Sequence, residues 1–289
     1  MKLRAYLIKN YSTTAISNYE KTIQRYVLTL GEKAETATHT DVLDYIGLLR
    51  KQQLHPKTLR NNLFAIKIYY RYLVFIGKRT DHPCQFLYLK DQINRQIHLE
   101  KLYTKEALSN FYSNYKANNA EHQQRNKIIL SLLIYQALIT IEITQLKVKD
   151  LNLEEGTIVI KGNTKNKGRT LGLKPNQILL FHEYLKKEYK NYWRKQKPSK
   201  RVDHFLLNES GLPLASGGIN RIINQKGASE KFTPLKIRQS IIARLLKENK
   251  DIRIVQEFAG HRRASSTEAY KQTGLEELKQ AIELLHPLQ

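Results

Sequence analysis

The sequence predicts a mainly helical protein of two domains, the second of which contains a small antiparallel sheet. Apolar residues recur at helical spacing through most of the chain, and one stretch alternates with the period of a strand. A polar break containing Gly77 and Pro83 interrupts the helical pattern over residues 77–100. We therefore place the domains at residues 1–95 and 102–289, with a linker at about 90–102.

The first domain is predicted to be entirely helical. Residues 11–30 and 39–54 carry apolar side chains at helical spacing. A third helix begins at Pro56, since proline suits the first turn of a helix. The apolar stripe of this third helix consists of Leu59, Leu63, Ile66, Tyr70 and Leu73.

A different face of the third helix is basic. It carries Lys57, Arg60, Lys67 and Arg71. No acidic residue occurs between Lys57 and Arg79 that could pair with them. This face is either an ordinary solvated surface or a row of contacts to nucleic-acid phosphates.

The second domain is predicted to be helical around one hairpin or small sheet. The stretch "EEGTIVIKGNTKNKGRTLGL" indicates the sheet, because Ile158 and Ile160 alternate before a turn rich in Gly, Asn and Lys. The predicted helices cover residues 104–119, 121–139, 141–147, 175–195, 216–226, 234–248, 251–259, 265–270 and 274–285.

The net charge of the chain is +23, from 49 Lys and Arg against 26 Asp and Glu. Both predicted domains are basic, so the charge is not confined to a tail, and a polyanion such as DNA is the expected partner. The single cysteine, Cys84, excludes a disulfide framework and a cysteine-based zinc site. No apolar run is long enough to span a membrane, and residues 1–20 lack the pattern of a signal peptide. We expect a cytoplasmic protein with no membrane partner.

No metal-binding, nucleotide-binding or hydrolase motif occurs in the sequence. Cutting a phosphodiester without a metal or other cofactor needs a nucleophile, positive donors around the phosphoryl oxygens and a proton source for the leaving oxygen. The residues that could fill these roles are Lys165, Arg238, His261 and Tyr270.

Each of these four residues also has a structural interpretation. Tyr270 could pack in a helical turn, and His261 could end a helix at a tight Gly-His turn. Arg238 needs an anionic partner in either case, because it lies inside an otherwise apolar helix. Lys161 and Lys167 are close enough in sequence to replace Lys165.

The order of these residues is similar to that of a known family. The stretch from "FTPLKIRQS" through "VQEFAGHRRASSTEAY" resembles the second signature box of the tyrosine recombinases, which include phage integrases and Xer-type site-specific recombinases. The spacing in sequence of Arg238, His261 and Tyr270 is similar to that of the corresponding residues in this family. Upstream, "YQALITIEITQLKVKD" resembles the first box, Lys165 falls at the position of the family's hairpin lysine, and residues 1–95 resemble the small DNA-binding domain.

Two positions depart from the family pattern. Ile139 stands where the first box has an arginine, and Leu235 stands where the second box has a histidine. Glu142 and Asp150 of the first box are retained. Losing one donor to transition-state charge typically costs about 10²–10³-fold in rate.

The resemblance implies a two-domain clamp around duplex DNA and a tetramer on two duplexes. Tyr270 would attack the scissile phosphate to form a 3′-phosphotyrosine, and Arg238 and His261 would bind the phosphoryl oxygens. Lys165 would protonate the leaving 5′-oxygen. The apolar positions of the last segment, which would pack on their own domain or on a neighbouring protomer, are Leu275, Leu278, Ile282 and Leu285.

Three alternatives stay open at this point. Ile139 and Leu235 favour a relative that has lost cleavage and serves as a DNA-binding accessory protein. A nicking enzyme similar to the type IB topoisomerases would use the same chemistry without a partner duplex. A basic DNA-packaging protein would bind DNA without any need for Tyr270 or Arg238.

Overall fold

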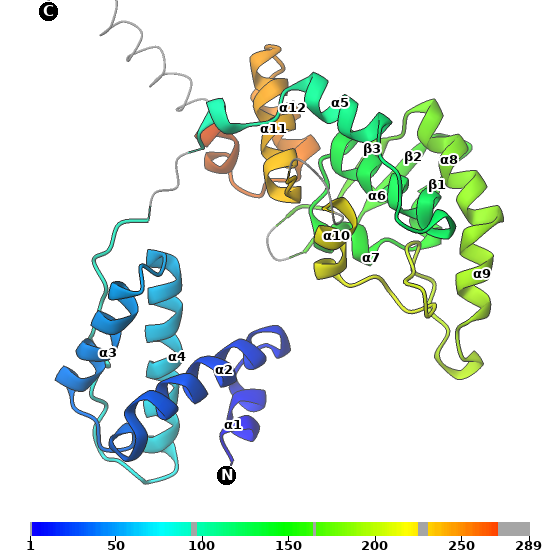
Figure 1. Ribbon diagram of the computed structural model, residues 1–289. Helices are drawn as coiled ribbons and strands as arrows, with labels where there is room; N and C mark the ends of the chain where they lie inside the picture. The colour runs from blue at the N-terminus through cyan, green and yellow to red at the C-terminus, as the bar shows by residue number, and fades with distance from the viewer. Residues whose placement is uncertain (1, 94–96, 164–165, 225–230, 271–289) are drawn as a thin grey trace, which may run out of the picture. The chain divides into compact units, whose positions relative to one another are not determined.

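The computed structural model describes residues 2–93, 97–163, 166–224 and 231–270. The chain divides into two compact units, Met1–Arg95 and Gln96–Gln289 (Figure 1). It is mostly helical with one small three-stranded antiparallel sheet, which confirms the predicted fold class. Within the described ranges, no helix has the length and apolar character needed to cross a membrane.

The first unit is built around α4, its longest helix, which packs against α1, α2 and α3. Its elements are α1 (Leu3–Asn10), α2 (Thr13–Leu30), the 3₁₀ helix η1 (Gly31–Ala34), α3 (His39–Lys51) and α4 (Pro56–Phe75). All five residues of the predicted apolar stripe on α4 are buried. The sequence did not indicate α1, because Leu7 is its one buried residue and leaves no periodic pattern.

The second unit is built around α6, whose residues 128–134 are all buried and which packs against α5, α8, α10 and α11. The sheet has the order β1-β2-β3, and β2 and β3 form the predicted hairpin. The helices are α5 (Lys105–Ser113), α6 (Gln123–Tyr135), α7 (Thr140–Gln145), α8 (Pro175–Lys186), α9 (Glu188–Arg194), α10 (Ser216–Ile223), α11 (Pro234–Lys247) and α12 (Ile252–Ala259). The 3₁₀ helices and strands are η2 (Leu99–Lys101), η3 (Ala120–His122), η4 (Val148–Asp150), β1 (Leu151–Asn152), β2 (Thr157–Ile160), β3 (Arg169–Gly172) and η5 (Pro198–Lys200).

Three helices predicted for the second unit end early or are broken for reasons that the structure shows. The helix predicted over 104–119 ends at Ser113, and the buried Tyr115 that follows donates its hydroxyl to the carbonyl of Ile222. The helix predicted over 121–139 ends at Tyr135, because Ala137 adopts a left-handed φ of 50°. The helix predicted over 175–195 is broken at Lys187, whose φ of −110° and ψ of −81° are not helical.

Candidate active site

The turn between α6 and α7 forms one wall of the site. Ala137 has positive φ, and Ile139 is extended and precedes the first turn of α7. The amide of Ile139 donates to Glu142 Oε2 at 3.0 Å, so this carboxylate caps its own helix. The turn thereby presents the carbonyl of Ala137 and the carboxylate of Glu142 to the interior.

A buried ion pair joins this turn to the sheet. Arg169 of β3 donates Nη1 and Nη2 to the two carboxylate oxygens of Glu142 at 2.8 and 3.1 Å. The two side chains are 2% and 1% exposed, and Asn166 Nδ2 adds a third donor at 3.0 Å. Burial alone would raise the pKa of Glu142, but the bonds and charge of Arg169 outweigh it and lower that pKa. The charges of this pair cancel.

Arg238 of α11 is a second buried arginine, 5% exposed. Its Nη1 donates to the carbonyl of Ala137 and its Nη2 to the carbonyl of Ala259, both at 2.5 Å. No ion pair to Arg238 occurs within the described ranges. Burial lowers the pKa of Arg238, yet a guanidinium stays protonated in proteins, so its positive charge is not compensated by the described residues. In the described part of the chain, two of its five N–H groups bond a carbonyl, which leaves three to bind an anion.

His261 lies next to this charge, at the end of α12. Gly260 has a left-handed φ of 69° and turns the chain, and its carbonyl accepts from the amide of Lys167 at 2.8 Å. His261 forms an isolated β-bridge with Asn166, so the hairpin is fastened to the Gly-His turn. The ring Nδ1 is 2.8 Å from the hydroxyl of Thr267. Burial, with Arg238 and Arg169 nearby, lowers the pKa of His261 to about 4, so the ring is neutral at pH 7.

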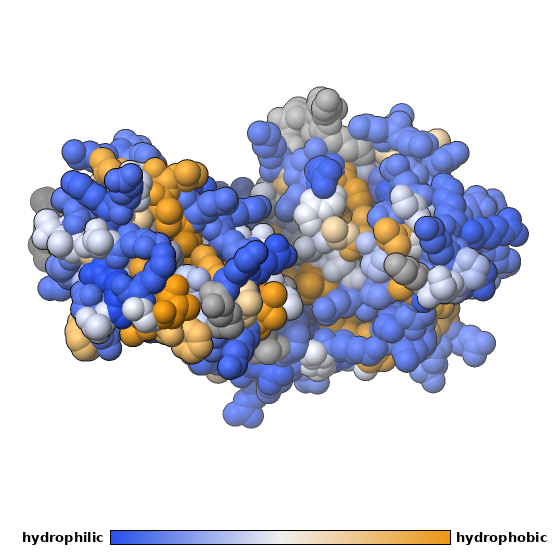
Figure 2. All heavy atoms as spheres, turned by 90° about the horizontal axis from the view of Figure 1, so that it is seen from below, coloured by the Kyte–Doolittle hydropathy of each residue, from blue (hydrophilic) through white to orange (hydrophobic). Residues whose placement is uncertain are grey.

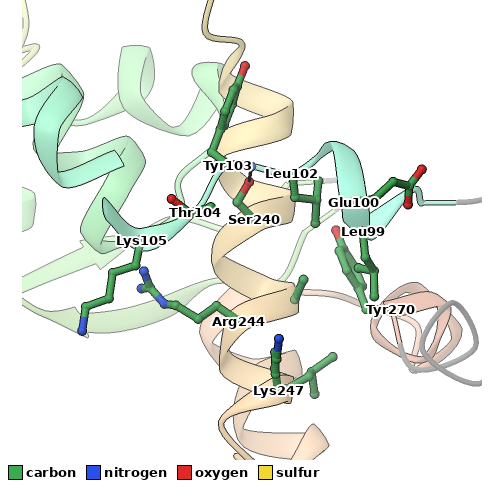
Figure 3. Close-up of a pocket in the computed structure, with 12 residues that line it drawn as sticks. Leu99, Glu100, Leu102, Tyr103, Thr104, Lys105, Ser240, Arg244, Lys247 and Tyr270 are labelled. Atoms are coloured by element: carbon green, nitrogen blue, oxygen red, sulfur yellow. Dashed lines mark hydrogen bonds between the residues drawn. The ribbon is translucent and has the colours of Figure 1, made fainter. Parts of the chain in front are cut away.

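Tyr270 is 9% exposed and packs with Ile242, Val255 and Ala259. Burial raises the pKa of its hydroxyl to about 12, and Arg238 opposes this shift. Its side chain also lines a pocket of about 650 Å³ and lies beside η2, next to Leu99 (Figure 3). Arg238 therefore acts electrostatically on both His261 and Tyr270, and α11, α12 and the residues after α12 bring the three side chains into one region.

Lys165 lies outside the described residues. Its neighbours Asn163 and Asn166 close the turn of the hairpin, with the amide of Asn163 donating to the carbonyl of Asn166 at 2.9 Å. Arg262 donates Nε and Nη2 to the carbonyl of Asn163, which ties the turn to the His261 segment. Lys167, the competing lysine, lines a pocket of about 300 Å³ together with His261.

The two positions that depart from the family pattern lie on the elements that build the site. Ile139 is half-buried at the start of α7, and Leu235 is 65% exposed in the first turn of α11. Leu235 precedes Arg238 by three residues, so the two share a side of the helix. Neither side chain can donate a hydrogen bond.

The basic face of α4 is partly occupied by its own chain. Arg60 donates to the carbonyl of Asp91 at 2.6 Å, and Lys67 donates to the carbonyl of Gln85 at 2.8 Å. Lys57 and Arg71 are exposed and form no ion pair in the described part of the chain. A neutral carbonyl does not cancel a charge, so all four residues of this face remain cations, and two of them are also held in place by bonds to the backbone of Gln85 and Asp91.

Three residues of the site were not singled out from the sequence: Asn166, Arg169 and Thr267. Arg169 could have been found, because it lies two residues before Leu171 in the predicted hairpin, and residues two apart in a strand point to the same face. A charged residue at an inward strand position indicates a buried partner. Asn166 and Thr267 carry no comparable signal.

The comparisons with known proteins cover nearly the whole chain. The family model described as Phage integrase family matches residues 101–276, and the model for the phage integrase N-terminal SAM-like domain matches residues 2–76. The chain is similar to tyrosine recombinase XerC of Listeria innocua, at 26% identity over 96% of this chain and 93% of the relative. It is also similar to tyrosine recombinase XerC of Bacillus pumilus, at 27% identity over 96% and 92%.

Two solved structures share the fold. The XerH site-specific recombinase bound to a palindromic difH substrate aligns with a TM-score of 0.67 and 22% identity, over 94% of this chain and 80% of that one. The Tn1549 transposon integrase in complex with transposon right end DNA aligns with a TM-score of 0.62 and 16% identity, over 96% and 98%.

Proposed function

Because the chain belongs to the phage integrase family of tyrosine recombinases, we propose that it is a site-specific recombinase that cuts and rejoins duplex DNA through Tyr270. The observation that carries this proposal is Arg238, a buried cation beside His261 and Tyr270 for which the described residues supply no carboxylate. A phosphodiester is the anion that fits a site with a neighbouring tyrosine nucleophile. The two similar solved structures contain DNA or a recombination substrate, which supports duplex DNA as the partner.

The proposed reaction is a transesterification. The phenol of Tyr270 gives up its proton to water as its oxygen attacks phosphorus, a phosphotyrosine bond forms, and the bond to the 5′-oxygen breaks. The proton that the 5′-oxygen gains balances the proton that the phenol loses. One phosphate ester replaces another, so no external energy source is required. The released 5′-hydroxyl, or one from a second duplex, reverses the step and either restores or exchanges the strand.

Arg238 and His261 would stabilise the phosphoryl oxygens during this step. Arg238 offers its three remaining N–H groups. His261 is neutral, so it donates from Nε2 only when the hydroxyl of Thr267 donates to Nδ1. Thr267 would thereby set the tautomer in which the imidazole can serve as a donor.

The leaving 5′-oxygen requires a proton. Lys165, at the turn of the hairpin, is our first choice for the donor, and the fastening of the hairpin to Gly260 and His261 supports it. Lys167 is the alternative, because it lines a pocket with His261. Replacing each lysine with methionine and using a substrate with a 5′-bridging sulfur, which leaves without a proton, would distinguish them. Activity is rescued only for the variant that lacks the acid.

The test of the proposal is covalent trapping. The full chain would be mixed with nicked duplexes cut from its own genomic flanks, with a Tyr270→Phe variant as the control. We expect a denaturation-resistant protein–DNA adduct that the variant does not form. Sequence-selective binding without any adduct would refute the cleavage mechanism and leave the DNA-binding accessory role.

Assembly is proposed to involve four protomers on two duplexes. The C-terminal segment that would join protomers lies outside the described residues. Strand exchange between two labelled duplexes would support recombination, whereas relaxation of supercoiled DNA without exchange would indicate a nicking enzyme. On the first domain, the proposed phosphate contacts are the four cations of α4, which are Lys57, Arg60, Lys67 and Arg71.

A further inference from the structure

The end of the second unit that carries α9 is strongly basic and has no role in the chemistry at Tyr270. Residues 186–201 contain eight basic residues and one acidic residue. Figure 2 shows a hydrophilic surface at this end of the unit. We define the basic end as the seven exposed cations Lys186, Lys187, Lys190, Arg194, Lys195, Lys197 and Arg201.

The basic end is not neutralised by its own acidic neighbours. Glu188 points inward, where its two carboxylate oxygens accept from the backbone amides of Gln124 and Arg125 at 2.9 and 3.0 Å. Asp203 is paired with Lys147 at 2.8 Å. Within the described ranges, none of the seven cations forms an ion pair.

One more carboxylate near the basic end is bonded elsewhere, and one of the seven cations is held by an aromatic ring. Glu183 accepts from the side-chain amide of Gln124 at 3.0 Å rather than pairing with Lys187 one turn later. The guanidinium of Arg201 stacks over Trp193 at 4.1 Å from the ring centre, which holds this cation in place. The surface is therefore a set of unpaired charges, part of which is ordered.

The spacing of the charges suits a nucleic-acid backbone. Lys190 and Arg194 lie one turn apart on the same face of α9, and Lys187 precedes Lys190 by three residues. From Lys190 to Arg194 the helix advances about 6 Å, over which one strand of a duplex carries about two phosphates.

The basic end cannot act on the phosphate that is being cut. In Figure 1, α9 lies at the opposite end of the second unit from α11 and α12, which carry Arg238 and precede His261 and Tyr270. We propose that the basic end binds duplex DNA outside the stretch held at the active site, without reading its sequence. This proposal rests on the function proposed above and adds a second DNA contact to it.

The test compares the salt dependence of binding to two duplexes. One duplex is trimmed to the shortest length that still gives the adduct, and the other carries the same site with unrelated flanks. The test variant is Lys187→Gln, Lys190→Gln, Arg194→Gln. We expect the slope of log K against log salt to fall by about 2–3 on the flanked duplex, since each lost phosphate contact removes about 0.9. On the trimmed duplex we expect no change.

Two controls make the result specific. A second variant, Lys101→Gln, Lys116→Gln, Lys250→Gln, removes the same charge from scattered exposed positions and should keep the slope. The slope of log K against log salt on the flanked duplex should also stay unchanged in a charge-conserving variant, Lys187→Arg, Lys190→Arg, Arg194→Lys. The adduct on the trimmed duplex reports on Tyr270 alone, so a failure of the cleavage mechanism and a failure of this proposal give different results.

Three outcomes would overturn the proposal. The slope on the flanked duplex could be the same for the test variant and the parent, which would make the basic end a solvated surface. The slope for the test variant could fall equally on the trimmed duplex, which would mean that the three residues contact the DNA that is held at the active site. The variant could instead lose binding to anionic lipid vesicles while its DNA slopes stay unchanged, which would assign the surface to a membrane.

Discussion

Arg169 and Arg238 are both buried arginines near the same histidine, yet they differ in their partners. Arg169 gives two hydrogen bonds to the carboxylate of Glu142, and their charges cancel. Arg238 gives its bonds to two neutral carbonyls, and its charge is left uncompensated by the described residues. A buried charge that is paired stabilises a fold only when both partners are present, whereas an unpaired one is retained at a cost to stability. We infer that Arg169 stabilises the structure of the site and that Arg238 binds the anionic ligand of the site.

Breaking the ion pair should give the largest effect. Arg169→Met leaves the Glu142 carboxylate buried without its cation, and we expect the free energy of unfolding to fall by about 3–5 kcal/mol. Trp193 is the one tryptophan in the chain and lies in the second unit, so its fluorescence during urea unfolding reports on that unit. The double variant Glu142→Met, Arg169→Met should recover most of the loss. A double variant as unstable as the single one would contradict the pairing argument.

Changing Arg238 should affect cleavage more than folding. Arg238→Met removes the cation that we propose binds the phosphate, and we expect the single-turnover rate of adduct formation to fall by about 10²–10³-fold. The carbonyls of Ala137 and Ala259 lose their donors, which costs about 1–3 kcal/mol, but removal of an unpaired buried charge offsets part of this. A variant that cleaves at the parental rate would show that Arg238 has a structural role like that of Arg169.

Restoring a family cation should raise the rate. Ile139→Arg puts a guanidinium at the start of α7, next to the turn whose Ala137 carbonyl binds Arg238. If the phosphate lacks a donor there, adduct formation should become faster by up to about 10²–10³-fold. The matched control is Ile141→Arg, an exposed position two residues later on the same helix. An equal response to both substitutions would point to general DNA attraction rather than to a missing donor.

The two arginines also show what could be predicted from the sequence. The helical fold with a small sheet followed from periodicity, because burial of one face leaves a regular pattern in α4 and β2. The helix that carries Arg238 was predicted from the same signal. The pairing of Arg169 with Glu142 was not predicted, because the two residues lie 27 positions apart and their contact depends on how the hairpin packs against the turn before α7.

The helix ends were the weakest part of the prediction for a related reason. The break at Ala137 is set by a left-handed residue whose carbonyl is held by Arg238, a contact that spans 101 residues. The early end of α5 follows from Tyr115, which is turned inward to bond Ile222. Local propensity has no access to such long-range contacts.

Gly260 lies against Arg169 and directly follows Ala259, whose carbonyl accepts from Arg238, so its replacement should disturb both arginines. A Cβ at this position would lie 2.5 Å from Arg169 Nη1, and the φ of 69° is unfavourable for any other residue. We expect Gly260→Ala to cost about 1–3 kcal/mol in the urea assay and to slow adduct formation. Gly217→Ala in α10 is the control, because a Cβ there meets nothing within 4 Å and alanine favours the helix. Equal stability of the two variants would remove the packing argument.

The smallest expected effect is a pH dependence of stability that comes from His261, since both arginines act on this ring. Its pKa is lowered from 6.5 to about 4 in the folded protein, by burial first and then by Arg238 and Arg169. Between these values the unfolded chain binds a proton that the folded chain does not, so stability is full above pH 6.5 and falls as the pH drops toward 4. His261→Gln should show a shallower loss of stability between pH 7 and pH 5 than the parent. In the double variant Glu142→Met, Arg169→Met, the depression of this pKa should be smaller, because one cation near the ring is gone. If NMR titration instead gave His261 an ordinary pKa in the parent protein, the ring would be neither buried nor close to the charge of Arg238, and the proposed arrangement of the phosphate site would be wrong.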